Sequence, residues 1–195
     1  KLRVGRLAGG GPVELVAGRT FRITTRPVLG TSDLVSCTYD GLPRDVRVGD
    51  GILLDDGLLR LTVTAVEGDT VTTRVDEGGL LGENKGMNLP GVAISAPAMT
   101  EKDRGDLPLG LLTLKIDYVA LSFVRTRQDV REARAVIDAS GQAAQLVVKL
   151  EKPEALEDLG GILDAADGVM VARGDLGVEV SPERVPGIQV EVIAE

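Results

Sequence analysis

Residues 145–179 read QLVVKLEKPEALEDLGGILDAADGVMVARGDLGVE, and this stretch decides the fold. It contains two short apolar runs, 145–150 and 167–172, and each run is followed by charged residues. Near-continuous apolar runs of this length are typical of buried parallel strands. A helical segment is expected between them, near 153–159. Strand, helix and strand in this order predict a parallel βα array with right-handed crossovers.

The same alternation extends on both sides of this stretch. A strand is expected at 118–124, a helix at 126–139 and a further helix from Pro186, a residue type that is tolerated in the first turn. Thr100 and Asp103 have the spacing of a helix N-cap and its N3 partner. With residues 1–5 as an earlier strand, the array has about four strands. A complete eight-stranded βα barrel needs about 250 residues, so a partial barrel is predicted and the native polypeptide is expected to be longer.

Residues 12–87 have a different pattern, with short alternating runs that are rich in Val and Thr. Gly-Asp pairs, Asp56-Gly57 and Gly78-Gly79 separate these runs as turns. Strands at this spacing predict a small barrel or sandwich, inserted between residues 1–5 and the next helix. The predicted strands lie at 21–25, 33–37, 51–57, 58–66 and 70–75.

The composition excludes several classes of function. The net charge of −8 argues against non-specific nucleic-acid binding. Histidine is absent and Cys37 is the only cysteine, which removes Ser-His and Cys-His mechanisms, intrachain disulfides and cysteine zinc sites. No apolar run approaches the roughly 18–20 residues of a membrane span, and the N-terminus does not resemble a signal peptide. A cytoplasmic enzyme with no membrane partner is expected.

The ends of the two apolar runs carry the residues best suited to chemistry. Lys149 and Glu151 are two apart on a predicted strand and therefore point the same way; an ion pair at a strand end is the simpler interpretation. After the second run, Gly174 permits close approach of a ligand, and the N–H groups of 174–176 could bind an anion at the start of a helix. A tight strand-to-helix turn is the alternative for Asp175 and its neighbours. Together the two segments favour a metal and anion site at one rim.

Four further residues are weaker candidates. Lys85, beside Gly86, suits a hinge whose cation meets a ligand when a lid closes, although a solvated linker lysine is favoured by composition. Asp56 belongs to a turn signature first and to a metal–nucleotide contact second. Arg3 could bind phosphate at a strand end. Ser122 follows an apolar strand and would also face the rim.

Seven segments are distinctive in combination: KLRVG (1–5), LLDDGLL (53–59), KGMNLPG (85–91), MTEKD (99–103), DYVALSFVR (117–125), VKLEKPEAL (148–156) and DGVMVARGDLGVE (167–179). Taken together and in this order, they resemble the pyruvate kinase family. The resemblance spans almost the whole chain. It implies an (αβ)₈ A domain with a mobile β-barrel B domain inserted after the third barrel strand. On this basis the A domain comprises residues 1–6 and 88–195, covering about barrel strands 3 to 6, and the inserted B domain comprises residues 7–87.

The resemblance also implies a reaction and its catalytic residues. The reaction is Mg²⁺-dependent (or Mn²⁺-dependent) phosphoryl transfer from phosphoenolpyruvate to ADP, giving pyruvate and ATP. Glu151 and Asp175 match the family's metal ligands. Lys149 matches the lysine that meets the phosphoryl group and the enolate oxygen, and Arg3 matches a phosphate-binding arginine. Gly174 and Asp175 match the turn whose amides hold the substrate carboxylate.

Other implied roles complete the site. Asp56 and Lys85 match residues on the B-domain side that approach the nucleotide and metal, and Ser122 and Phe123 match strand-end positions that line the substrate. One departure lies beside the metal ligand: the family's usual Lys-Ile-Glu-Asn is Lys-Leu-Glu-Lys here, ending in Lys152. The parity of the strand points Lys152 away from Glu151.

Parts of the family's architecture fall outside this sequence. The first two and the last two barrel strands are absent, and so is the C-terminal domain that usually carries an effector site and a tetramer contact. Potassium is an implied cofactor, but most of its ligands belong to the absent strands. A homotetramer is implied for the whole protein.

Two other hypotheses remain open at this point. The first is a metal-dependent 2-oxo-acid lyase or aldolase of a related barrel, which would share the carboxylates and the enolate chemistry. It would have no use for an inserted domain that carries Asp56 and Lys85. The second is a non-catalytic piece of the kinase, because a partial barrel leaves strand edges open and the site incomplete.

Overall fold

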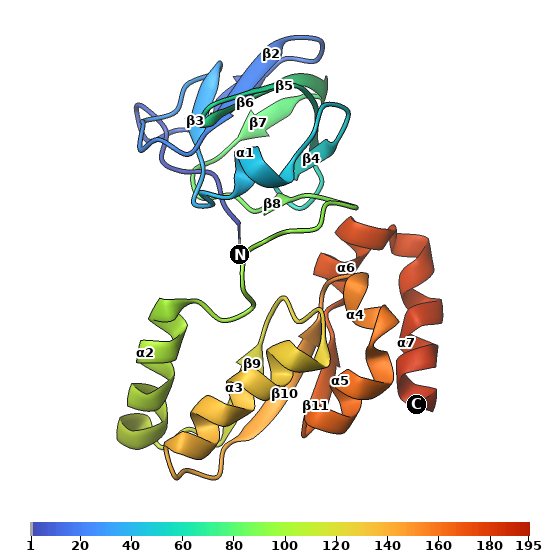
Figure 1. Cartoon of the computed structure of the whole chain (residues 1–195). Helices are drawn as coiled ribbons and strands as arrows, with labels where there is room; N and C mark the ends of the chain where they lie inside the picture. Colours follow the sequence, from blue (N-terminus) through green and yellow to red (C-terminus); the bar gives the residue numbers. More distant parts are fainter. Residues whose placement is uncertain (1) are drawn as a thin grey trace. The chain divides into compact units, whose positions relative to one another are not determined.

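The computed structural model describes residues 2–195, and the chain divides between Ala96 and Pro97 into two compact units. The first unit is mostly β (Figure 1). Its strands form a six-stranded sheet of order β3-β2-β6-β5-β4-β8 and a two-stranded antiparallel ladder of β1 and β7. The elements of this unit are β1 (Val13–Leu15), β2 (Thr20–Thr24), β3 (Leu34–Ser36), α1 (Leu42–Asp45), β4 (Gly51–Leu54), β5 (Leu59–Glu67), β6 (Thr70–Glu77), β7 (Gly79–Leu81) and β8 (Met87–Asn88).

Alternating burial explains why these segments are strands. In β5, Leu59, Leu61 and Val63 are buried, and in β6 Val71 and Val75 are buried, while residues between them are exposed or half-buried. This period of two places one face of the strand on the core. Residues from both sheets enter one apolar core, as expected for a small inserted β domain.

The start of the chain belongs to this β core. Val4 is fully buried in it, and Arg3 and Val4 form single antiparallel bridges with Gly86 and Cys37. Residues 1–5 were expected to be an earlier strand of the βα array; in the described residues 2–5, the apolar Val4 side chain is buried in the first unit instead. The assignment of residues 1–6 and 88–96 to the A domain stays a prediction.

The second unit is a parallel sheet with helices (Figure 1). Three strands, β9, β10 and β11, pair in parallel with β10 in the centre. The fold prediction is therefore confirmed as an α/β chain with part of a parallel βα barrel and a β insertion. The elements are α2 (Glu101–Leu109), η1 (Gly110–Leu114), β9 (Tyr118–Leu121), α3 (Arg127–Ala139), β10 (Gln145–Leu150), α4 (Glu154–Glu157), α5 (Leu159–Ala165), β11 (Gly168–Val171), α6 (Arg173–Val180), η2 (Pro182–Arg184) and α7 (Val185–Ala194).

The core of the second unit is built on the central strand. Leu146, Val148 and Leu150 of β10 are fully buried, at alternate positions. Helix α3 contributes an apolar stripe that includes Val130 and Ile137. The helix that was expected near 153–159 is shorter than predicted, and a second helix, α5, follows it after Asp158.

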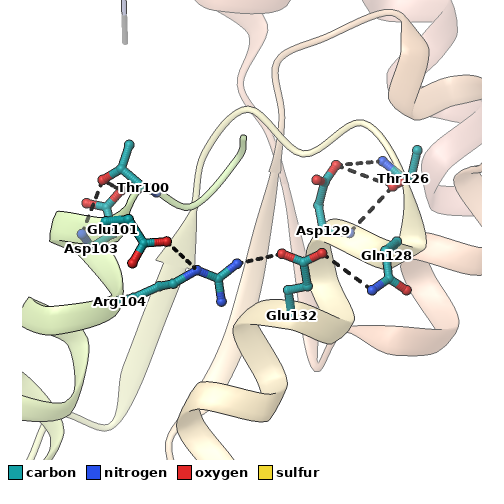
Figure 2. Close-up of polar contacts among 8 residues, drawn as sticks. All are labelled: Thr100, Glu101, Asp103, Arg104, Thr126, Gln128, Asp129 and Glu132. Carbon is teal, nitrogen blue, oxygen red and sulfur yellow. Dashed lines mark hydrogen bonds and ion pairs between the residues drawn. The ribbon is translucent and has the colours of Figure 1, made fainter. Parts of the chain in front are cut away.

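Helices α2 and α3 of this unit both begin with a capping box (Figure 2). Thr100 caps α2 and Thr126 caps α3. Each threonine side chain accepts a hydrogen bond from the backbone N–H of the aspartate three residues later, and the side chain of that aspartate accepts one from the backbone N–H of the threonine. These capping boxes satisfy N–H groups that have no partner within the helix. Arg104 of α2 then donates to Glu132 of α3 at 2.6 Å, which links the two helices.

Candidate active site

The carboxyl ends of the three parallel strands place the predicted residues at one edge of the sheet. Ser122 and Phe123 directly follow β9, Glu151 directly follows β10, and α6 begins at Arg173 after β11. Because the strands are parallel, with Leu150 in register with Val171, their carboxyl ends meet at the same edge. Neighbouring strands lie about 4.8 Å apart. Groups that follow them can therefore act on one small ligand.

Lys149 and Glu151 contact each other, as their strand parity predicts. The Lys149 ammonium forms an ion pair with Glu151 Oε1 and also donates to Ser122 Oγ at 3.3 Å. The Glu151 side chain is only 3% exposed, whereas that of Lys149 is 25% exposed. The carboxylate is thus almost removed from water, and the ammonium still reaches solvent.

The second oxygen of Glu151 is held by the neighbouring strand end. The backbone N–H of Phe123 donates to Glu151 Oε2 at 3.1 Å. Phe123 has a φ of 58°, in the left-handed region that non-glycine residues rarely adopt. This conformation is a local strain of the kind found at functional sites. The Glu151 carboxylate is therefore held by a backbone amide on one oxygen and by the Lys149 ammonium on the other.

The segment after β11 forms a strand-to-helix turn. Helix α6 starts at Arg173 immediately after Ala172, whose backbone N–H bonds to Leu150 O at 3.2 Å and whose side chain cannot cap a helix. A Cβ atom built on Gly174 would meet nothing within 4 Å, so the backbone there is open to a ligand. The first N–H groups of a helix have no acceptor within the helix and attract anions. A shallow, open depression of about 640 Å³ lies beside this turn and is lined by Arg173, Gly174, Pro182, Val185 and Pro186.

A buried ion pair next to these residues was missed by the sequence reasoning. Lys152 donates to Glu179 of α6 at 2.7 Å, and the two side chains are 5% and 2% exposed. The parity of β10 did separate Lys152 from Glu151, as expected. No local pattern in the sequence indicates its partner, because Lys152 and Glu179 lie 27 positions apart.

The remaining candidates lie together in the first unit. Arg3 Nη1 donates to Asn84 O at 2.7 Å, and Lys85 Nζ pairs with Asp55 Oδ1 at 2.9 Å. The backbone N–H of Asp55 bonds to Gly86 O at 3.0 Å, so residues that are far apart in sequence share one corner. Asp55 and Asp56 both have positive φ, 51° and 54°, which agrees with the turn signature. The roles of Arg3, Asp56 and Lys85 toward a nucleotide stay predictions.

The side chains of the protein provide only part of the ligand set that a hard divalent cation such as Mg²⁺ requires. Glu151 and Asp175 offer carboxylate oxygens at the same sheet edge, and Mg²⁺ in enzymes is commonly bound by one or two carboxylates plus substrate oxygens and water. No group of three or more His, Cys, Asp or Glu side chains arranged to hold a metal occurs among residues 2–195. Glu151 and Asp175 are thus candidate carboxylate ligands for a magnesium ion whose remaining ligands would come from a bound substrate and water.

Comparison with known proteins decides the family. A model of the pyruvate kinase barrel domain matches residues 1–195. The chain belongs to the pyruvate kinase family. It is 48% identical over 193 residues to a pyruvate kinase of Mycobacterium tuberculosis, covering 99% of this chain and 40% of that protein. It is 47% identical over 199 residues to pyruvate kinase 2 of a Synechocystis strain, covering all of this chain and 33% of that protein.

A solved structure of the pyruvate kinase family agrees with the fold. The crystal structure of a pyruvate kinase from Cryptosporidium parvum matches with a TM-score of 0.89 at 37% identity, covering 100% of this chain and 41% of that chain. The resemblance drawn from the motifs is confirmed. The chain spans about a third to two fifths of the length of these relatives. None of the helices in the described part is long and apolar enough to cross a membrane.

Proposed function

We propose that this chain forms part of a pyruvate kinase that transfers the phosphoryl group of phosphoenolpyruvate to ADP, giving pyruvate and ATP. The observation that carries the proposal is the ion pair of Lys149 and Glu151 at the sheet edge, within a chain of this family. We propose a cytoplasmic location from the bacterial relatives. The homotetramer and the use of K⁺ stay expectations taken from the family.

The proposed division of labour follows from the contacts. Glu151 and Asp175 would hold Mg²⁺, which supplies neutralisation of the charge on the phosphoryl and enolate oxygens. The Phe123 N–H holds the Glu151 carboxylate in one orientation. Lys149, a quarter exposed, presents an ammonium group to the transferring phosphoryl group and to the enolate oxygen.

The turn at the start of α6 would bind the substrate carboxylate. The backbone amides at Gly174 and Asp175 lie at a helix N-terminus, where a carboxylate is favoured. Ser122 accepts from Lys149 and keeps that side chain at the sheet edge. Arg3, Lys85 and Asp56 are proposed to bind phosphate and nucleotide from the first unit.

A coupled assay on the complete polypeptide that carries this chain tests the function. Pyruvate and ATP should form from phosphoenolpyruvate and ADP, and production should stop when Mg²⁺ is chelated and resume when Mn²⁺ is added. Formation of pyruvate from another 2-oxo acid without any ADP would support the lyase or aldolase instead. Absence of ATP production under all of these conditions would refute the proposal.

The 195-residue chain by itself is expected to show little turnover. In the described sheet β9 and β11 are the outer strands, and Tyr118 and Met170 on them are 65% and 47% exposed. Open apolar edges of this kind favour association with other chains over a rigid site. A coupled assay that gives the isolated chain the same turnover number as the complete polypeptide would contradict this expectation.

A further inference from the structure

The ion pair of Lys152 and Glu179 is more deeply buried than the catalytic pair beside it. Both of its side chains are at most 5% exposed, and the Nζ to Oε1 distance is 2.7 Å. Removing two charges from water is unfavourable unless they are paired with good geometry. A well-packed apolar pair would often be at least as stable, so the ion pair calls for an explanation other than stability.

Its position relative to the proposed metal ligands gives that explanation. Lys152 is the residue after Glu151, at the end of the central strand. Glu179 lies four residues after Asp175 on α6, so the two carboxylates lie on the same face of that helix, one turn apart. A bond from the end of β10 to Glu179 therefore limits the rotation of α6 about its axis and turns the face that carries Asp175 toward the end of β10.

The charge on the Glu179 carboxylate also supports a role for Lys152 near the proposed metal ligands. Without Lys152, the Glu179 carboxylate would be a buried negative charge one helical turn from Asp175, one of the two proposed metal ligands. Lys152 neutralises it without occupying Glu151, whose oxygens are bonded to Lys149 and to the Phe123 N–H. Two lysines three residues apart, Lys149 and Lys152, thus bind two different carboxylates.

We propose that Lys152 and Glu179 form a positioning pair that aims Asp175 at the metal site beside Glu151. The proposal rests on the proposed function, because Glu151 and Asp175 are the metal ligands only within it. It predicts that metal affinity depends on the Lys152–Glu179 bond itself. A pair with a purely structural role would affect metal affinity only through loss of stability.

The test uses Mn²⁺ titration of the complete, substrate-free polypeptide, followed by electron paramagnetic resonance, together with thermal unfolding of each variant. Lys152→Met and Glu179→Gln should each raise the Mn²⁺ dissociation constant by about 10- to 100-fold, as the loss of outer-shell partners does elsewhere. The double variant Lys152→Met/Glu179→Leu should recover the thermal midpoint that the single variants lose but should still bind Mn²⁺ weakly. Lys152→Arg, which keeps the charge, should bind Mn²⁺ nearly as well as the wild type.

Lys102→Met is the matched control. Lys102 forms an ion pair with Asp106 on α2, but its side chain is 82% exposed, so its removal should change neither Mn²⁺ affinity nor stability appreciably. Wild-type Mn²⁺ affinity in folded Lys152→Met, or recovery of affinity together with stability in the double variant, would overturn the positioning role. If the wild type neither binds Mn²⁺ nor forms ATP, the proposed function itself fails; if it does both and the variants match it, only the positioning role fails.

Discussion

Replacement of Lys149 by Met removes the ammonium group and keeps most of the volume of the side chain. The group is proposed to stabilise charge that develops during phosphoryl transfer, and deletion of one such preorganised donor typically lowers kcat by about 10²- to 10³-fold, or about 3–4 kcal/mol. A decrease of this size is expected for Lys149→Met in the complete polypeptide. The coupled assay for pyruvate formation measures it.

The contacts of Lys149 also predict how Lys149→Met changes the unfolding free energy and the Mn²⁺ affinity. Breaking a buried ion pair costs about 3–5 kcal/mol when the remaining charge has no other partner. Here Glu151 keeps the Phe123 N–H and Lys149 is 25% exposed, so the loss of unfolding free energy should be smaller, about 2 kcal/mol. Since the ammonium leaves Glu151 Oε1, the variant should bind Mn²⁺ at least as tightly as the wild type. Unchanged kcat, or loss of Mn²⁺ binding in the folded variant, would refute the role given to Lys149.

Three further predictions concern the second unit. Leu150→Ala, which truncates a fully buried side chain of the central strand, should lower the unfolding free energy by about 2–5 kcal/mol in urea denaturation; a loss below about 1 kcal/mol would mean that the sheet is not packed as described. Thr126→Ala removes the cap of α3 and should cost about 1 kcal/mol in the same measurement, whereas Thr126→Ser should cost much less. The pKa of the Asp167 carboxyl is held below its ordinary value of 3.8 by the Leu146 N–H and by Arg134, so its stabilising effect is present above about pH 4 and is lost as the pH falls through the lowered pKa. Asp167→Asn should therefore be less stable than the wild type at pH 7 but show a smaller further loss on acidification, and equal acid sensitivity of the two proteins would contradict the assignment.

Much of the fold followed from local patterns in the sequence. The apolar run 145–150 was predicted to be a strand because its length and punctuation fit a buried one, and β10 has these bounds. The helix expected at 126–139 is likewise present as α3, and the cap expected at Thr100 is present at the start of α2. Residues 2–5 were expected to belong to the βα array because a short apolar segment can be buried in either core; Val4 is buried in the core of the first unit and bridges to Cys37, a long-range pairing that no local pattern indicates.

The site could be predicted only where the chemistry is local in sequence. The Lys149–Glu151 contact follows from strand parity, and the motifs indicated the family. The bond from the Phe123 N–H to Glu151 depends on a left-handed backbone that no pattern at a phenylalanine indicates. The Lys152–Glu179 pair joins residues 27 positions apart, and nothing in the spacing alone specifies that the lysine would be buried rather than solvated.

The two residues that follow the central strand β10 bind the segments that follow both neighbouring strands. Glu151 accepts from the Phe123 N–H after β9, and Lys152 donates to Glu179 of α6, the helix after β11. The Phe123 amide lies in a connecting segment, yet it is shielded by a nearly buried carboxylate. Its hydrogen should thus exchange with deuterated solvent on the slow time scale of the β10 amides rather than at the speed usual for loops. Loosening of this rim would then occur as one cooperative event across all three strand ends, instead of as independent fraying of each loop.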